Sequence, residues 1–365
     1  MTERFICSDG AELILWKDSD FEQYEELEKS LRVDGFAYYD KRNEGDVIFS
    51  TFIKDNHIVY LSYTPSEQCI RQISKENAVL YNKENLSVKN KVTPLLTQVQ
   101  NKFVSVDCGM SYVIRVCDGR FVLIDGGFGE CGEAEHLWDV LMSQYEGDDK
   151  PVIAAWFITH PHCDHFGVFV KFMDKYGEKV RVESILYNWA TESMSPPASG
   201  LHDLAEFNRI IEACRDTVKI ITPRTGQRYI FADAVFDILF VCEDLYPEKI
   251  PNVNNTSLVM RMELAGRRVL WTGDIQKQGA DYLCKRFPAE TFRCEIFQVS
   301  HHGYGDGSDE LHRKADPEIL LWPCPDYRFS EVRLWEINDY WIHSPNIRAT
   351  IVSGQEEVVL DMTNT

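Results

Sequence analysis

The 365-residue sequence lacks any hydrophobic run long enough to cross a membrane, and no apolar stretch follows its first residues, MTERFICSDG. A membrane-spanning helix needs about 20 consecutive apolar residues, and a secretory signal peptide needs a shorter apolar run near the N-terminus. Internal repeats and low-complexity tracts are also lacking. We therefore expect a cytoplasmic globular protein without a membrane partner.

Paired cysteines are missing too. The 11 cysteines are scattered and none forms a CxxC pair, which is the spacing typical of zinc ribbons and thiol redox motifs. In a reducing compartment disulfides are rare, so we expect free thiols that behave as small buried side chains. We expect the same of Cys163, despite its position within a polar motif, and assign it no nucleophilic function.

Basic residues are few: 38 Lys and Arg stand against 58 Asp and Glu, a formal net charge of −20. An acidic surface lowers the local concentration of polyanions, so small molecules or short phosphodiesters are favoured over long nucleic acids as partners. A bound metal can reverse the field locally, and nucleic acid is therefore not excluded. The 44% hydrophobic content supports an ordinary packed core.

The chain divides into two parts with different patterns. Residues 1–92 mix strand-like segments with two charged helical ones, which predicts a small α+β accessory domain; this part has no cluster of metal-binding or nucleophilic residues. Residues 93–365 alternate strands and helices, including a hairpin formed by MSYVIRV and RFVLIDGG. This second pattern predicts a layered α/β sandwich. The purpose of the first domain and the oligomeric state stay open.

A crowded polar motif, ITHPHCDHFG at 158–167, follows the apolar strand-like run PVIAAWF. If the backbone bends after the strand, His160 and His162 can face one ion, while Asp164 and His165 face a second position. Imidazole suits zinc, iron or manganese, and carboxylate extends the range to harder ions. The spacing therefore predicts a site for two metal ions.

Further candidates stand at the ends of other predicted strands. Asp274 ends RRVLWTGD and could bridge two ions, and His301 and His302 end CEIFQVSHHG. Asp125 closes FVLID and could orient a metal ligand without touching metal. An Asp before Gly is commonly a turn residue. Because all these residues share a position at strand ends, we interpret them as functional residues instead.

The segments LIDGG, THPHCDH, NNTSLVMRMELAGRRVLWTGD and VSHHG together resemble the metallo-β-lactamase superfamily. The last two resemble more specifically the hydrolase domain of ComEC/Rec2-type competence proteins. The likeness covers residues from about 95 to 365 and implies an αββα four-layer sandwich with a two-metal cleft at one sheet edge. Competence proteins of that family carry membrane-spanning segments. This sequence has no such segment, so the resemblance does not imply DNA uptake.

The resemblance also implies a ligand set. His160 and His162 would hold the first metal, Asp164, His165 and His301 the second, and Asp274 both. Asp125 would support the cluster, and His302 is the weaker candidate of its pair, for contacts behind the ligands or with substrate. We expect two divalent ions, with zinc favoured and manganese or iron as alternatives.

The sequence departs from the superfamily pattern at one ligand position of the first metal. The loop IPNVNNTSLVM contains asparagines where most of the superfamily supplies a third histidine. We therefore expect a weaker first site, completed by water or by an Asn carbonyl, and Asn255 is a weak candidate for contacts with the ligands or substrate. His202 could substitute, but its place before a predicted helix favours a surface position.

Two cations lower the pKa of a water between them and polarise a carbonyl or phosphoryl oxygen. With Asp164 as the catalytic carboxylate, we expect a metal-dependent hydrolase acting on a phosphodiester or other phosphate ester. Hydrolysis of a lactone, thioester or amide is the alternative, and a non-catalytic metal-binding interaction module on the same fold is another.

The aromatic segment at 321–343 contains Trp322, Trp335 and Trp341. Its helical spacing favours core-facing tryptophans over a substrate-cleft lining. His343, at its end, is a weak candidate for substrate binding.

Overall fold

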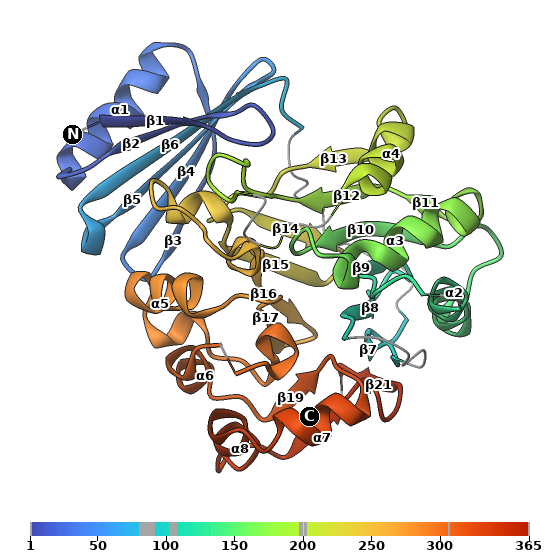
Figure 1. Ribbon diagram of the computed structural model, residues 1–365. Helices are drawn as coiled ribbons and strands as arrows, with labels where there is room; N and C mark the ends of the chain where they lie inside the picture. Colours follow the sequence, from blue (N-terminus) through green and yellow to red (C-terminus); the bar gives the residue numbers. More distant parts are fainter. Residues whose placement is uncertain are drawn as a thin grey trace.

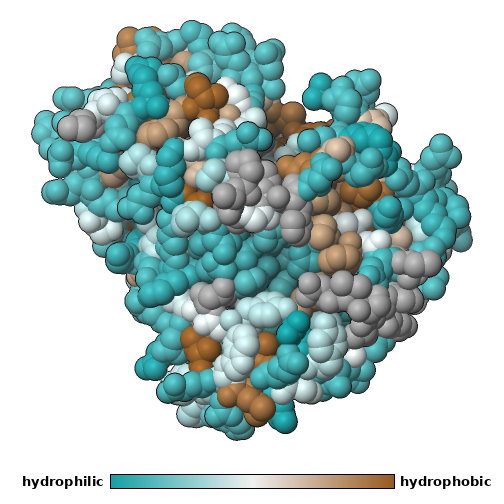
Figure 2. Space-filling view, viewed as in Figure 1, coloured by the Kyte–Doolittle hydropathy of each residue, from teal (hydrophilic) through white to brown (hydrophobic). Residues whose placement is uncertain are grey.

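The computed structural model describes residues 2–79, 92–101, 108–130, 132–196, 200, 203–305 and 307–363. Figure 1 shows an N-terminal sheet in blue beside two further sheets, with the C-terminal helices in red below. The face seen in Figure 2 is largely hydrophilic, as the charged composition leads one to expect. Among the described helices, none is both long and apolar enough to cross a membrane.

The N-terminal part is a six-stranded antiparallel sheet in the order β1-β2-β6-β5-β4-β3. Its strands are β1 (Thr2–Ile6), β2 (Glu12–Trp16), β3 (Ala37–Glu44), β4 (Val47–Lys54), β5 (His57–Thr64) and β6 (Cys69–Glu76). Helix α1 (Phe21–Val33) is capped at its N-terminus by Asp20, whose side chain accepts a hydrogen bond from Gln23 N. It buries Tyr24 and Leu31 against the sheet.

The rest of the chain forms two sheets packed face to face. The first, in the order β13-β12-β10-β9-β8-β7-β21 with β11 beside β10, is partly parallel; the second has the order β14-β15-β16-β17-β18-β19-β20. The first contains β7 (Leu95–Gln98), β8 (Ser111–Arg115), β9 (Phe121–Asp125), β10 (Val152–Ile158), β11 (Arg181–Val182), β12 (Ser184–Tyr187), β13 (Lys219–Ile221) and β21 (Val358–Asp361). The second contains β14 (Arg228–Phe231), β15 (Ala234–Phe240), β16 (Val259–Leu264), β17 (Arg267–Trp271), β18 (Ile296–Gln298), β19 (Ile319–Trp322) and β20 (Ala349–Val352).

Helices cover the outer face of each of these two sheets. The first is covered by α2 (Glu133–Gln144), α3 (Cys163–Tyr176) and α4 (Ala205–Cys214). Beside the second lie α5 (Lys277–Arg286), α6 (Asp309–Ala315), α7 (Asp326–Val332) and α8 (Glu336–Ile342). Short 3₁₀ turns are η1 (Pro65–Glu67), η2 (Gly177–Lys179), η4 (Cys242–Leu245), η5 (Val253–Thr256), η6 (Ala289–Thr291) and η7 (Ser300–Gly303).

Between the two sheets lies a core of apolar side chains that includes Ile124, Phe157, Met260 and Trp271. The layering is thus αββα, as expected from the resemblance. The expected hairpin is confirmed as well: β8 and β9 pair antiparallel, and the turn between them uses Gly119 at φ 86°.

The N-terminal sheet packs directly on the sandwich. One apolar cluster contains Leu13 and Phe49 from this sheet together with Phe240 from β15. Arg224, which is buried, lies 2.8 Å from Asp9 across this contact. Strand β6 ends at Glu76 and β7 begins at Leu95, and the division into domains at residues 92 and 93 stays a prediction.

Close backbone packing fixes helix α3 against the loop that follows β9. A Cβ added to Gly167 would lie 1.9 Å from the carbonyl oxygen of Phe128, and one added to Gly129 would lie 2.7 Å from the carbonyl carbon of Gly167. Val168 N also donates a hydrogen bond to Gly127 O at 3.2 Å. The first turns of α3, which carry Asp164 and His165, therefore have one position relative to the end of β9.

We predict that Gly167→Ala destabilises the fold by about 1–3 kcal/mol, because α3 must move away from Phe128. Urea unfolding of the metal-free protein measures the change. Gly177→Ala, at the other end of α3, is the matched control: its added Cβ meets only Met173 Cε at 3.6 Å, and φ is −54°. Equal stability of the two variants would contradict the close-packing argument.

Candidate metal centre

The candidate ligands gather where strands of the two packed sheets end. Strands β9 and β10 are parallel neighbours, as are β17 and β18. Parallel strands bring their carboxyl ends to the same edge of a sheet. The loop after β10 contains His160, the loop after β17 contains Asp274, and the turn after β18 contains His302.

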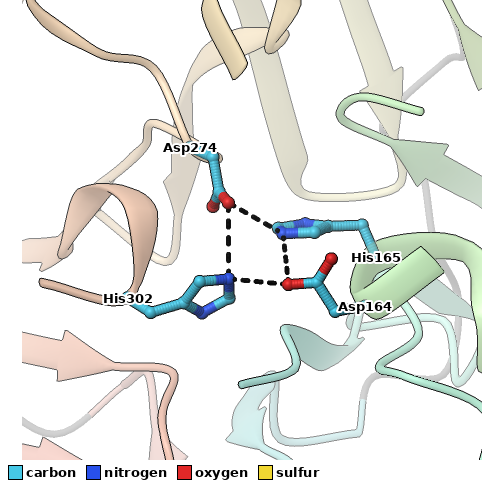
Figure 3. A group of neighbouring side chains, drawn as sticks. All are labelled: Asp164, His165, Asp274 and His302. Carbon is cyan, nitrogen blue, oxygen red and sulfur yellow. Dashed lines mark hydrogen bonds and ion pairs between the residues drawn. The ribbon is translucent and has the colours of Figure 1, made fainter. Parts of the chain in front are cut away.

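One group consists of Asp164, His165, Asp274 and His302, with ligand atoms all within 4.8 Å of one another (Figure 3). His302 Nε2 lies 3.0 Å from Asp164 Oδ2 and 3.3 Å from Asp274 Oδ2. His165 Nε2 lies 3.2 Å from Asp274 Oδ2 and 3.7 Å from Asp164 Oδ2. Two imidazoles and two carboxylates thus surround one point.

A second group consists of His160, His162 and Asp274. His160 Nε2 lies 3.1 Å from His162 Nδ1 and 3.7 Å from Asp274 Oδ2. Asp274 belongs to both groups, which is the position expected of a bridging carboxylate.

Unsatisfied polar atoms show that these residues fit metal ions. Asp274 Oδ1 and His165 Nε2 are buried and make no hydrogen bond with any described residue. Leaving a carboxylate oxygen such as Asp274 Oδ1 without a hydrogen-bond donor in a protein interior costs free energy, which a cation at this point would offset. The mixture of imidazole nitrogen and carboxylate oxygen suits zinc, manganese or iron.

Asp125 lies behind the ligands and is fully buried. Its Oδ2 accepts a hydrogen bond from His165 Nδ1 at 2.6 Å, and its two oxygens accept from the backbone N and the hydroxyl of Thr159, both at 2.7 Å. Because Nδ1 of His165 is held by Asp125, Nε2 faces Asp274 and Asp164. Asp125 thus occupies the supporting position expected from the sequence.

The pKa values in the cluster are strongly perturbed. Burial lowers the pKa of His165, but Asp274, Asp125 and Asp164 outweigh burial and raise it to about 10. Burial likewise opposes the charged form of His302, yet Asp274 and Asp164 raise its pKa well above the usual value. The pKa of Asp274 lies well below its usual value because the nearby imidazoles overcome its burial.

His160 behaves in the opposite way: burial and the neighbouring His165 hold its pKa well below the usual value. A neutral imidazole is the form that binds metal. His160 is therefore ready to bind at neutral pH, whereas a metal ion must displace protons from His165 and His302.

The structure corrects the choice between the two consecutive histidines. It places His302, rather than His301, in the ligand group. His301 Nε2 instead lies 3.0 Å from Asn254 Nδ2. The physical reason is a tight left-handed turn, with φ of 46° at His301 and 54° at His302, while His302 Nδ1 donates a hydrogen bond to Pro323 O at 2.6 Å.

Asn255 is also corrected. Its Oδ1 accepts hydrogen bonds from Gln276 N at 3.2 Å and Gly279 N at 3.0 Å, so it holds the start of α5 and not the ligands or a substrate. Its neighbour Asn254, which the sequence analysis did not single out, is only 3% exposed, contacts His301 and leaves its Oδ1 without a hydrogen-bond partner among the described residues. Consecutive side chains in this short turn point in different directions, and this decides which asparagine lies beside His301. No signal in the sequence distinguishes the two asparagines.

His343 is the third correction. Its side chain is 71% exposed at the end of α8, where it contacts Asp339 of the same helix. Trp341 is buried, as the helical spacing indicates, and Trp322 is buried at the end of strand β19. Trp335, which the same spacing placed towards the core, is 43% exposed. His202 lies outside the described residues.

Comparison with known proteins agrees with this arrangement. A family model described as the metallo-beta-lactamase superfamily matches residues 106–308. The chain belongs to the metallo-beta-lactamase superfamily. ComE operon protein 3 of Bacillus subtilis (strain 168) is 24% identical over 169 residues, which make up 46% of this chain and 19% of that protein. The chain therefore spans about a fifth of this curated relative.

Solved structures of the fold are similar at low sequence identity. The metallo-beta-lactamase fold protein YhfI from Bacillus subtilis is 12% identical, with a TM-score of 0.43 and coverage of 73% of this chain and 99% of that one. Unliganded yeast PDE1 is 11% identical, with a TM-score of 0.43 and coverage of 72% and 98%. The short form of human tRNase Z is 14% identical, with a TM-score of 0.39 and coverage of 73% and 99%.

The family and the ligand groups together identify a metal-dependent hydrolase of the metallo-β-lactamase fold. The nature of the metal and the substrate are separate questions.

We predict that Asp125→Asn lowers zinc affinity about 10–100-fold, because an amide no longer favours the proton on His165 Nδ1. Competition with a chromophoric chelator measures the affinity. Asp118→Asn, in the β8–β9 turn, removes a carboxylate remote from the ligands and should leave zinc affinity unchanged. Unaltered affinity in Asp125→Asn would show that the carboxylate does not orient the ligand.

Metal binding should release protons. At pH 7 the metal-free protein holds protons on His165 and His302, since both pKa values are raised, and zinc must displace about two of them. Zinc affinity should therefore increase as the pH rises from 6 towards 10. Titration calorimetry in buffers of different ionisation enthalpy counts the released protons, and a heat independent of buffer would contradict the prediction.

Proposed function

We propose that this protein hydrolyses a phosphodiester or other phosphate ester of small size at a centre for two divalent ions. Zinc is favoured, with manganese or iron as alternatives. The observation that carries the proposal is the shared carboxylate of Asp274, whose Oδ2 lies 3.7 Å from His160 Nε2, 3.2 Å from His165 Nε2 and 3.3 Å from His302 Nε2.

Each ligand has a place in this proposal. His160 and His162 would hold one ion, Asp164, His165 and His302 the other, and Asp274 both. Two such ions supply Lewis acidity that activates water and polarises a phosphoryl oxygen. Their positive charge would also offset the repulsion between an anionic substrate and a chain of net charge −20.

Asp164 is the proposed catalytic carboxylate. It stands in the first turn of α3, and its side chain keeps 17% of its surface exposed, whereas those of His165, Asp274 and His302 are nearly fully buried. The surrounding imidazoles outweigh its burial and lower its pKa, so it is ionised at neutral pH. An ionised carboxylate here would accept a hydrogen bond from the attacking water and orient it towards the phosphorus.

One observation supports phosphorus over carbon as the electrophile, and a second supports a small substrate. The segments around Asn254, Asp274 and His302 resemble the competence-type branch, and the curated relative matched over 169 residues is ComE operon protein 3. The acidic composition supports small or short substrates rather than long nucleic acids. We further infer a weaker first site, because the group of His160, His162 and Asp274 includes no third histidine among the described residues.

The test starts with metal content per chain of protein purified without added metal. Hydrolysis of bis(p-nitrophenyl) phosphate is then measured with zinc, manganese or iron restored. We expect metal-dependent turnover. Bound metal without turnover would move the assignment to carbon esters, lactones or amides, or to a binding function, and failure to bind any metal would overturn it.

We predict that the double variant Asp164→Asn, His165→Ala loses metal from the second site and all measurable turnover, while circular dichroism shows an intact fold. The matched control is Asp339→Asn, His343→Ala, which removes another Asp and His pair, on the exposed surface of α8. The control should keep full metal content and turnover. Turnover in the first variant equal to that of the control would exclude the proposed mechanism.

A further inference from the structure

A row of rings leads from the ligand cluster towards the surface. Tyr304 follows His302 by two residues, and its ring centroid lies 6.4 Å from that of His302 and 5.1 Å from that of His301. The indole of Trp335 comes next, 6.4 Å from Tyr304 with an angle of 49° between the ring planes. The Arg328 guanidinium lies 5.3 Å from the centre of the Tyr304 ring.

The outer end of this row is exposed. Trp335 is 43% exposed and Tyr327, on whose ring Arg328 also lies at 5.4 Å, is 40% exposed. Figure 2 shows brown side chains gathered at the bottom of the view, where Figure 1 places α7 and α8. Large apolar side chains gain free energy by burial, and exposed groups of them often mark a binding surface.

The row is rigidly attached to the turn that carries His302. A Cβ added to Gly305, which has φ of 77°, would lie 2.8 Å from Trp335 Cε3, so the indole rests directly on the backbone there. Asn338 is fully buried and donates hydrogen bonds to Gly303 O at 2.6 Å and to Val332 O at 2.8 Å. The position of Trp335 is therefore fixed relative to the ligands.

We propose that Trp335, with Tyr304 and Arg328, forms a specificity subsite for a planar heteroaromatic ring, such as a nucleobase, joined to the phosphate held at the metal centre. The subsite rests on the proposed phosphodiesterase function. Aromatic faces bind bases by stacking, and arginine adds a cation–π contribution. The substrate class is then a short nucleotide phosphodiester.

The net charge of the chain agrees with this class. The Arg328 guanidinium, which also pairs with Glu331 at 2.7 Å, lies beside the rings of Tyr304 and Tyr327. A long polyanion would have to extend over a chain with an excess of 20 acidic residues. A single nucleotide unit avoids that repulsion.

The test compares two substrates with the same leaving group: p-nitrophenyl thymidine 5′-phosphate, which carries a base, and methyl p-nitrophenyl phosphate, which does not. In Trp335→Ala we expect KM for the thymidine ester to rise about tenfold, with kcat/KM for the methyl ester unchanged. Trp335→Phe should restore most of the affinity. Tyr340→Ala, another exposed aromatic on α8, is the matched control and should behave as wild type on both substrates.

An equal loss on both substrates in Trp335→Ala would indicate a merely structural contribution, and unchanged KM values would overturn the subsite. A second measurement separates this inference from the proposed function. If the wild type hydrolyses neither ester, the phosphodiesterase assignment fails, and calorimetric binding of thymidine 5′-monophosphate to the metal-loaded protein decides the subsite alone. Binding weakened about tenfold in Trp335→Ala supports it; equal binding, or none in the wild type, overturns it.

Discussion

The buried carboxylate of Asp274 constrains how the two halves of the sandwich meet. It comes from the sheet that contains β17, whereas His160 and His165 come from the loop and helix after β10 in the facing sheet. A charged group at this depth is tolerated only with compensating partners. The two sheets must therefore pack with these strand ends aligned, and the apolar core between them maintains that alignment.

The surroundings of the cluster hold each ligand from behind. Asp125 fixes His165, Pro323 O fixes His302, and the close approach of Gly167 to Phe128 fixes the start of α3. None of these contacts needs a metal ion to form. The ligand atoms are consequently close to their binding positions before metal arrives, which lowers the entropic cost of forming the centre.

The N-terminal sheet and helices α7 and α8 differ in how they are connected to the metal centre. The N-terminal sheet is attached through an apolar cluster and the buried Arg224, and it adds no residue to either ligand group found among the described residues. Helices α7 and α8 are instead tied to the turn of His302 by Asn338. The position of α7 and α8 therefore depends on the turn that carries His302, whereas the N-terminal sheet contacts the sandwich away from both ligand groups.

By itself the sequence determined a layered α/β sandwich, and its resemblance to the metallo-β-lactamase superfamily implied the αββα layering and a ligand set. It also brought His160, His162, Asp164 and His165 together, because they lie within six consecutive positions. Only the tertiary structure decided between His301 and His302, placed Asn254 rather than Asn255 beside His301, and separated the exposed Trp335 from its two buried counterparts. Those choices depend on left-handed backbone turns and on contacts such as Pro323 O, which come from segments distant in the chain. Residue spacing has no access to such long-range contacts.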